Sequence, residues 1–560
     1  MQHLLTLHDP QAARDHYLAG TWRNETMYKL LRHHATARGH RFALSDASHR
    51  LTWLQLLGWV DQVAAHLHLA GLSAGDRVAV WLPNRVEAVV VFLACSRNGY
   101  VCNPSLHQNY TVKEIIGLLD SISCRTLFAQ DGYGADAREY NVFREAAQLP
   151  SLRRTYALDG KERHEADHFG AEGFPERGGS AVPPPPDSNP DKIVYLAFTS
   201  GTTGKPKGVM HSDNTLLANG RAMVQDWGHD ENTILLTLSP VSHHIGMVAL
   251  EQSLVAGCEL VVKDPASDMS PLEWIERSGA TYVMGVPTHA MDLLAAMKAA
   301  AVQKLGGVKV FYMAGAPIPQ ETAEQFMRIG VTPQNVYGMT ENGSHQYTLP
   351  TDSAAVITST CGRACRGYEV KLWNPERPNE EVAPGEIGEI GGRGALLMLG
   401  YFGNQTVTEN SFNSSGWFLS GDLGQLDEHG NVRIVGRKKD LIIRGGHNIH
   451  PAHIEGLAHR HPGVAKAAVF AVADERLGER VCLAIVASGT SPVDGAQMLN
   501  HLAASGLSKF DMPEFFVVLD EFPLTASGKI LKRELIAWVG TGRVKPTPVR
   551  WTPANAREKG

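Results

Sequence analysis

The sequence predicts an α/β protein with a large N-terminal domain of stacked, mostly parallel α/β sheets plus a small β-rich subdomain, and a small C-terminal α/β domain. Apolar stretches suited to buried strands alternate with helix-like stretches along most of the chain. This alternation is typical of βαβ units around parallel sheets. A chain of 560 residues is also too long for one hydrophobic core, so several compact units are expected.

The first alternating region begins near Asp76. It is expected to form strand, helix, strand, helix and strand over residues 77–83, 86–99, 100–105, 111–123 and 124–129. Its longest apolar run, 88–95, is far shorter than the about 20 residues that a membrane-spanning helix needs. We therefore expect a buried helix there and no membrane span.

A proline-rich segment over about 175–190 interrupts the alternation. Four consecutive prolines, 183–186, cannot pair inside a sheet or continue a helix, so a stiff surface connector is expected, with recognition by a proline-binding partner as the alternative. The alternation then resumes. A strand, a helix and three further strands are expected over residues 192–200, 214–227, 280–287, 308–315 and 333–339.

Glycine-punctuated short strands, among them GYFGN at 400–404, predict the β-rich subdomain over about 350–436. A compact α/β pattern follows the charged stretch 436–440, which has the composition of a domain boundary. The expected organisation is a large domain 1–436, a hinge 437–440, a small domain 441–545 and a tail 546–560.

Composition excludes several classes of protein. The formal net charge is −6 and the chain has no dense basic block, so a nucleic-acid partner is not expected. The seven cysteines lack the paired spacing of a zinc site. The N-terminus lacks the features of a signal or transit peptide, so a cytoplasmic protein with reduced thiols is expected.

The strongest local motif is TSGTTGKPKG at 199–208, which follows an apolar strand and precedes a predicted helix. Glycines allow tight backbone geometry, while hydroxyls, amides and lysines suit phosphate oxygens. The segment is not a Walker A loop, because Pro206 stands where Ser or Thr would hold magnesium. A glycine-rich surface turn without function is the alternative.

Residues 195–212, YLAFTSGTTGKPKGVMHS, resemble the phosphate loop of the adenylate-forming superfamily, which includes acyl-CoA synthetases, peptide-synthetase adenylation domains and beetle luciferases. Further motifs of that superfamily follow in the same order, from about Asn24 to Val539. The resemblance implies ATP, Mg²⁺ and coenzyme A as ligands. The implied phosphate-loop residues are Thr199, Ser200, Gly201, Thr202, Thr203, Gly204, Lys205 and Lys207.

Residues 240–246 resemble the family's P-x-x-H-x-x-G segment. The resemblance implies that His243 borders the acyl pocket near the carboxylate, with His244 as the neighbour that could take its place. A histidine with a purely structural role is the alternative.

Two further segments, 315–317 and 337–341, match the turn that lines the adenine pocket and the segment after it. The resemblance implies that Tyr337 stacks on adenine, Thr340 donates to phosphate and Glu341 holds Mg²⁺, which prefers hard oxygen ligands. A plain core aromatic is the alternative for Tyr337. The implied nucleotide contacts are Gly315, Ala316, Pro317, Tyr337, Gly338 and Met339.

GWFLSGD at 416–422 resembles the family's ribose-binding motif, with Ser420 in place of the usual threonine. It implies that Asp422 accepts hydrogen bonds from the ribose hydroxyls and that Arg437 is a second ribose or phosphate contact. Lys439 falls at the family's hinge position, about which the small domain is expected to be mobile.

The last motif, PLTASGK at 523–529, implies that Lys529 bridges the attacking carboxylate and the α-phosphate. Gly445 and Gly446 would lie near the pantetheine arm, because glycines let a backbone approach a thin ligand. His447 stands where the family often has Glu, which leaves the identity of the thiol carrier open.

These motifs predict an AMP-forming acid–thiol ligase that acts on a small carboxylic acid. Carboxylate and phosphate repel each other, so catalysis must come mainly from positioned positive charge. Stretches such as GMTENG and IIRGG are closest to ligases for medium-chain, alicyclic or aryl carboxylates. The expected pocket wall is apolar, which disfavours amino acids and dicarboxylates. That wall is Val241, His243, Met247, Val286, Gly315 and Met339.

Two other functions stay open at this stage. The acceptor could be the thiol of a carrier protein instead of coenzyme A, and a homologue that binds acyl groups or nucleotides without catalysis is a minor alternative. A homodimer is also left open by the sequence.

Overall fold

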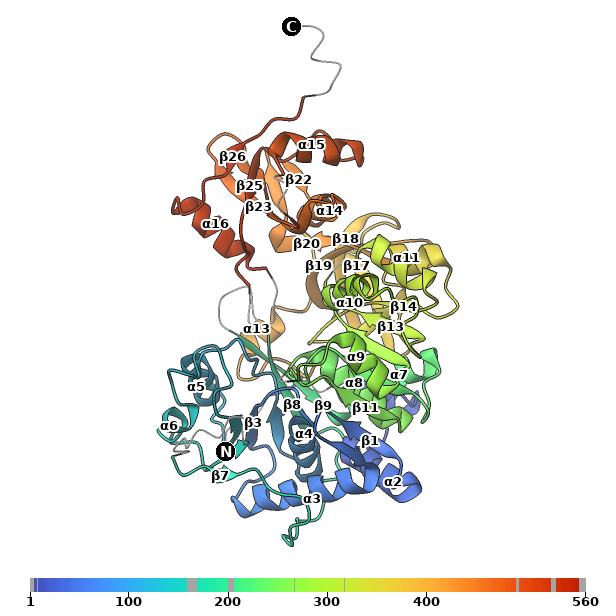
Figure 1. The fold of residues 1–560 in the computed structure, drawn as a ribbon, viewed down its shortest axis with the longest axis vertical. Coiled ribbons are helices and arrows are strands. Elements are labelled where there is room, and N and C mark those ends of the chain that lie inside the picture. The colour runs from blue at the N-terminus through green and yellow to red at the C-terminus, as the bar shows by residue number, and fades with distance from the viewer. Residues whose placement is uncertain are drawn as a thin grey trace. The chain divides into compact units, whose positions relative to one another are not determined.

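A computed structural model of the protein describes residues 5–7, 9–158, 169–199, 206–265, 267–316, 318–489, 493–524 and 530–552 (Figure 1). The chain forms two compact units. The first comprises Met1–Val370, Gly392–Phe418 and His429–Val432, and the second comprises Lys371–Gly391, Leu419–Glu428 and Arg433–Gly560.

The first unit contains a seven-stranded sheet in the order β7-β6-β5-β3-β4-β8-β9. All of its pairs are parallel except β8 with β9. These strands are β3 (Arg77–Trp81), β4 (Val101–Asn103), β5 (Thr126–Gln130), β6 (Arg154–Leu158), β7 (Glu172–Gly173), β8 (Ile193–Thr199) and β9 (Lys207–Ser212). The predicted alternation of strand and helix around Asp76 is confirmed.

Helices accompany this sheet. The helix α4 (Val86–Asn98) is buried at every position, as its apolar run predicts. Its partners include α2 (Met27–Arg38) and α3 (Trp53–Leu69), while α5 (Val112–Ser121) and α6 (Val142–Ala146) contact each other. Residues 174–192, which include the proline-rich segment, form no helix or strand.

A nine-stranded sheet of the same unit runs in the order β16-β15-β14-β13-β12-β10-β11-β1-β2. It is parallel from β1 to β14 and antiparallel at both ends. Its strands are β1 (Phe42–Ser45), β2 (Arg50–Thr52), β10 (Ile234–Thr237), β11 (Glu259–Val262), β12 (Tyr282–Gly285), β13 (Val310–Met313), β14 (Thr332–Met339), β15 (Gly343–Tyr347) and β16 (Arg363–Ala364).

Two long helices, α7 (Asp213–Trp227) and α8 (His244–Ala256), pack against each other and against strands of the large sheets. Both belong to a core cluster that draws residues from each sheet, so the two sheets share one hydrophobic interior. The remaining helices of the unit are α1 (Pro10–Leu18), α9 (Pro271–Ser278), α10 (Pro287–Ala299), α11 (Gln320–Arg328), α12 (Ala354–Ser359) and α13 (Gln405–Glu409).

A four-stranded sheet in the order β17-β18-β19-β20 has residues in both units. Its strands are β17 (Tyr368–Trp373), β18 (Ile387–Gly394), β19 (Phe418–Leu426) and β20 (Val432–Arg437). This sheet forms where the glycine-punctuated strands predicted a β-rich region.

The second unit also contains a sheet in the order β22-β21-β24-β25-β26, with β23 paired to β24. Apolar clusters lie on its two faces. The elements after the short 3₁₀ helix Lys438–Asp440 are β21 (Ile442–Arg444), β22 (His447–Ile449), α14 (Pro451–Ala458), β23 (Val464–Asp474), β24 (Gly478–Ala487), α15 (Gly495–Ala504), β25 (Phe515–Val518), α16 (Lys532–Gly540) and β26 (Thr547–Pro548).

Two expectations about local structure were wrong. A strand, β9, separates the 199–208 motif from the next helix, because this stretch pairs with β8 along its whole length. The GYFGN stretch is not a strand of its own, since it makes only an isolated bridge between Tyr401 and Val209. Within the described residues, no helix combines the length and the apolar character needed to cross a membrane.

Candidate active site

The ends of the predicted phosphate loop are held side by side by a β-hairpin. Thr199 at the end of β8 pairs with Lys207 at the start of β9, and β8 is buried over most of its length. The predicted residues Ser200, Gly201, Thr202, Thr203, Gly204 and Lys205 lie outside the described residues. The hairpin therefore fixes the two stems of this loop, while its tip stays a prediction.

A second hairpin, between β14 and β15, carries the segment from Tyr337 to Glu341. Met339 pairs with Gly343 across a bulge, and the Met339 N–H donates to Asn342 Oδ1 at 3.2 Å. A side chain at Gly338 would clash with the Gly343 carbonyl oxygen, so this position accepts only glycine in the observed conformation. The turn places Thr340 and Glu341 at its tip.

Glu341 is 9% exposed and is fixed from both ends. The Tyr401 hydroxyl donates to Glu341 Oε1 at 2.9 Å, and the Glu341 carbonyl accepts from Met398 N–H at 2.7 Å. Burial first, and then the Glu341 carboxylate, raises the pKa of Tyr401, which keeps this hydroxyl protonated as a donor. The Glu341 carboxylate is thus held in one orientation.

Tyr401 also contacts the phosphate-loop hairpin. The Lys207 ammonium lies 4.8 Å from the centre of the Tyr401 ring, within the range of a cation–π contact. One tyrosine therefore touches both a predicted phosphate-binding lysine and the predicted magnesium ligand. The sequence reasoning missed it, because GYFGN was interpreted only as a short strand.

The neighbouring Thr340 and Tyr337 are held by buried histidines. The Thr340 carbonyl lies 2.7 Å from His211 Nε2, and burial lowers the pKa of His211 to about 4, so His211 is neutral and donates here. The Tyr337 ring meets the His345 ring edge to face at 5.3 Å. Tyr337 itself is 9% exposed.

The 240–246 segment wraps around the start of α8. His243 N–H donates to the Pro240 carbonyl and Gly246 N–H donates to the His243 carbonyl, each at 2.9 Å. A side chain at Gly246 would clash with the backbone of Pro240 and Val241, which explains the glycine of this motif. The segment folds into a tight turn that presents His243 at the N-terminus of the helix.

His243 and its neighbour His244 lie in different surroundings. The His243 ring is 5.8 Å from the His107 ring. His244 Nδ1 is 3.3 Å from the Tyr195 hydroxyl, and its ring stacks on His211 at 5.8 Å. Burial lowers the pKa of His244 well below its usual value.

Gly315 lies at the end of β13 with φ +89°, a conformation that favours glycine. A Cβ built there would be 3.6 Å from Val286 Cγ1 and 3.8 Å from Ile245 Cδ1. Two of the predicted pocket residues, Gly315 and Val286, therefore lie close together with Ile245, which the sequence reasoning did not name. Its position two residues after His243 on a helix was the available signal.

The other predicted wall residues are spread over two apolar clusters. Val241 and Met247 belong to the large core of the first unit and are 4% and 1% exposed. Met339 packs instead beside Tyr401 in a separate small cluster. Ala316 is exposed, and Pro317 lies outside the described residues.

In the second unit, Asp422 and Arg437 form an ion pair. Arg437 Nε lies 2.9 Å from Asp422 Oδ1, and the Asp422 side chain is only 8% exposed. Ser420 Oγ accepts from the Asp422 N–H at 3.1 Å, so the hydroxyl that replaces the family's threonine supports the turn. The two residues predicted as separate ribose contacts are bonded to each other.

The remaining predicted residues of this unit lie in or near the strands β20, β21 and β22. Gly445 and Gly446 have φ of +57° and +86° in the turn between β21 and β22. His447 Nε2 is 2.7 Å from Asp511 Oδ1. Burial lowers the pKa of Lys439, in the 3₁₀ helix after β20. Lys529 lies outside the described residues.

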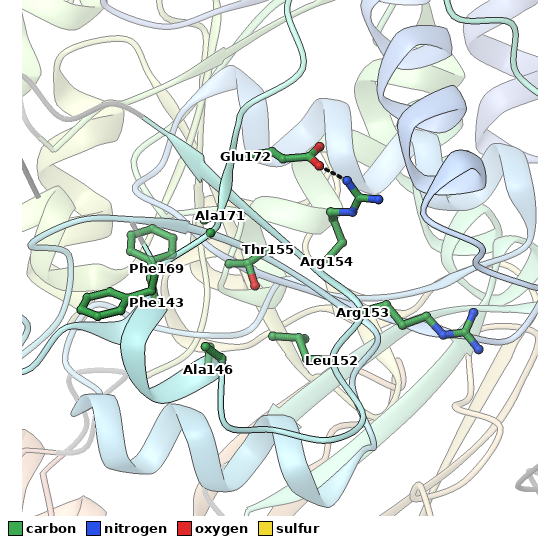
Figure 2. A pocket seen from close by; sticks show the side chains of 11 residues that line it. Phe143, Ala146, Leu152, Arg153, Arg154, Thr155, Phe169, Ala171 and Glu172 are labelled. Atoms are coloured by element: carbon green, nitrogen blue, oxygen red, sulfur yellow. Dashed lines mark ion pairs between the residues drawn. The ribbon is translucent and has the colours of Figure 1, made fainter. Parts of the chain in front are cut away.

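A cavity of about 310 Å³ lies elsewhere in the first unit, between β6, β7 and α6 (Figure 2). Arg154 and Glu172 form an ion pair at one side of it, and Phe143 and Phe169 lie at the other. None of its lining residues belongs to a predicted motif. We do not assign the candidate site to this cavity.

Most of the chain is similar to known proteins. Residues 31–402 match the AMP-binding enzyme family, and residues 453–529 match the AMP-binding enzyme C-terminal domain. A medium-chain fatty-acid–CoA ligase of Escherichia coli is 28% identical over 92% of this chain and 90% of its own. A salicylyl-CoA synthase / salicylate adenylyltransferase of Streptomyces is 30% identical over 94% and 96%.

Solved structures support the same family assignment. The ATP-bound MatB from Rhodopseudomonas palustris superposes with a TM-score of 0.79 at 28% identity, over 92% of this chain and 99% of that one. The fold, the two hairpins and these relatives define an AMP-forming acid–thiol ligase. The chain belongs to the AMP-binding enzyme family, within the adenylate-forming superfamily that its motifs resemble. ATP and coenzyme A as substrates fit this family.

Proposed function

We propose that the protein joins a carboxylic acid to coenzyme A in two steps. The acid carboxylate attacks the α-phosphate of ATP, which forms the acyl-adenylate and releases pyrophosphate. The thiol of coenzyme A then attacks the acyl carbon, which forms the thioester and releases AMP. The observation that carries the proposal is Tyr401, which contacts both Lys207 of the phosphate-loop hairpin and Glu341.

The first step brings two anions together, so it depends on positive charge. Glu341 fits a magnesium ligand, because it is a hard oxygen donor in a fixed orientation, and Mg²⁺ commonly uses one or two carboxylates together with phosphates and waters. Bound Mg²⁺ would screen the triphosphate charge. Lys207 and the rest of the loop bind the phosphates, and Thr340 donates to them. No general base is needed, since the attacking carboxylate is already ionised.

Residues of the second unit complete the proposed chemistry. Asp422 and Arg437 contact the ribose, and Lys529 bridges the attacking carboxylate and the α-phosphate. The backbone at Gly445 and Gly446 lies along the pantetheine arm during the second step. A rotation of the small domain about Lys439 switches the enzyme from the first step to the second. In such conformational cycles, one adenylate meets a different set of groups in each step.

The proposed substrate is a medium-chain, alicyclic or aromatic carboxylic acid. The names of the relatives support it, since they include ligases for medium-chain fatty acids, salicylate and 2-succinylbenzoate. Val286 and Ile245, the apolar neighbours of Gly315, support it too, because they suit an uncharged acyl group beside His243. A carrier-protein thiol is the second candidate acceptor, because His447, which pairs with Asp511, stands where the family often has Glu.

A pyrophosphate-exchange screen of about thirty acids, repeated with and without coenzyme A, tests the proposal. Exchange with medium-chain or aryl acids, followed by release of an acyl-CoA when coenzyme A is added, is the expected result. Exchange without any thioester to free coenzyme A moves the acceptor to a carrier protein. Binding of nucleotide without exchange for any acid contradicts the proposal and indicates a non-catalytic homologue.

A further inference from the structure

Glu251 in α8 is a completely buried carboxyl group to which the described residues offer no hydrogen bond. It is 0% exposed, and both of its carboxyl oxygens lack a partner in the described ranges. The next side chain, Gln252, is 1% exposed, and its Oε1 lacks a described partner as well. Because buried polar atoms in native proteins are nearly always hydrogen-bonded, these neighbouring oxygens point to a ligand or to bound water.

The strands around Glu251 are those that lead to the candidate site. Tyr195 and Tyr312 are close enough to Glu251 that, after burial itself, its charge raises the pKa of each phenol. Tyr195 lies four residues before Thr199 on β8, and Tyr312 lies three residues before Gly315 at the end of β13. Glu251 therefore lies beneath the ends of two strands that carry predicted nucleotide contacts.

The helix α8 connects Glu251 to the predicted acyl pocket. His244 and Glu251 are seven positions apart, which is about two turns, so both face the same side of the helix. Both lie near Tyr195, since His244 Nδ1 is 3.3 Å from its hydroxyl. On the neighbouring helix, a Cβ added to Gly220 would be 2.9 Å from Glu251 Cβ, so α7 packs closely against this part of α8.

Burial raises the pKa of Glu251 well above its usual value, which favours the neutral form of its carboxyl group. A neutral carboxyl donates one hydrogen bond and accepts others. A hydroxyl group has the same capacity and carries no charge into the interior. A ligand hydroxyl therefore matches Glu251 in both polarity and charge.

We propose that Glu251 forms the far end of the acyl site and binds a hydroxyl group at the distal end of the acid substrate. This inference rests on the proposed function. Glu251 lies eight residues beyond His243, which corresponds to about 12 Å along a helix. The substrate is therefore a medium-length acid whose hydroxyl lies far from its carboxylate. A distance of about 12 Å corresponds to a chain of about ten carbons.

The test compares ω-hydroxy acids with unsubstituted acids of the same length in the pyrophosphate-exchange assay. The wild-type protein should prefer the hydroxy acid in kcat/KM by about 10- to 100-fold, the usual effect of satisfying buried hydrogen-bonding groups. Glu251→Met should remove most of this preference, and Glu251→Gln should retain part of it. The matched control is Glu87→Gln, since Glu87 is also buried with a raised pKa but lies at the start of α4.

The outcomes separate this inference from the proposed function. A wild-type ratio near one contradicts the inference without any variant, and it indicates that internal water satisfies Glu251. An equal ratio in wild type and Glu251→Met contradicts it too, while exchange itself leaves the proposed function intact. No exchange with any acid overturns the proposed function, and the inference with it.

Discussion

The Tyr401 hydroxyl donates a 2.9 Å hydrogen bond to the buried carboxylate of Glu341, sixty residues earlier in the chain. The same tyrosine ring lies under the Lys207 ammonium. The proposed magnesium ligand and the proposed phosphate-binding lysine are thus contacted by one aromatic side chain.

Replacement of this tyrosine tests the arrangement. Tyr401→Phe removes only the hydroxyl group, so Glu341 Oε1 loses this hydrogen-bond donor. We expect the free energy of unfolding to fall by about 1 to 3 kcal/mol, and kcat for adenylation to fall about tenfold or more, with a higher Mg²⁺ requirement. Urea melts and pyrophosphate exchange at varied Mg²⁺ measure these effects.

The control for that change is Tyr133→Phe, because Tyr133 is also buried but lies outside both hairpins. It should leave the Mg²⁺ requirement unchanged. An identical Mg²⁺ dependence in Tyr401→Phe and wild type would show that the tyrosine does not position the metal ligand.

The turn before α8 gives a prediction about stability. Gly246→Ala forces a methyl group into the backbone of Pro240, so we expect destabilisation by about 2 kcal/mol or more and a loss of activity. Gly58→Ala is the matched control, since Gly58 lies inside α3 and a Cβ there meets nothing within 4 Å. That control should stabilise the protein by about 0.5 to 1 kcal/mol. Equal melting temperatures for the two variants would contradict the close approach.

Lys529→Ala should separate the two half-reactions. We expect loss of acyl-adenylate formation, because no cation then bridges carboxylate and α-phosphate, while thioester formation from supplied acyl-AMP persists. The exposed Lys545→Ala is the control and should retain both reactions. Equal loss of both steps in Lys529→Ala would refute this division of roles. Stopped-flow release of pyrophosphate and thiol consumption report the two steps.

Buried neutral histidines predict a loss of stability in acid. Burial holds the pKa of His211 at about 4, below its unfolded value of 6.5. The unfolded chain therefore binds a proton that the folded protein does not between pH 6.5 and about 4, so stability is complete above 6.5 and falls as pH is lowered through this window. This one residue contributes a loss of about 2 kcal/mol at pH 5.

Urea melts at pH 7 and pH 5 check this sign. His211→Gln should show a smaller difference between the two pH values than the wild type. Gly58→Ala, which changes no titratable group, serves as the control, and its pH dependence should match the wild type. A steeper pH dependence in His211→Gln would contradict the neutral state of this imidazole.

Much of the fold was accessible from the sequence, because buried helices and strands leave continuous apolar runs. The run at 88–95 predicted the buried helix α4. The strand β9 was missed, since glycine and polar residues within Lys207–Ser212 hide its pattern. Its burial comes from pairing with β8, which no local periodicity reports.

The site was predictable as motifs but not as contacts. The motif predicts a role for Glu341, and that role stays a prediction, whereas Tyr401 gave no signal, because only tertiary structure brings it to Glu341. Glu251 was missed for a related reason, whereas Ile245 was missed although its position two residues after His243 was a signal. A helix as apolar as α8 gives no clue to which of its faces meets a ligand.

We predict that the ion pair between Asp422 and Arg437 affects how tightly a nucleotide is bound. A carboxylate with so little contact with water needs a partner at all times, and the arginine supplies one while the enzyme waits for substrate. A ribose that reaches Asp422, as we predict, finds a charge already engaged and must share or replace that partner. The free energy of ribose binding is then lowered by the free energy of the ion pair that the ribose replaces. We therefore expect that this ion pair favours release of AMP after each turnover.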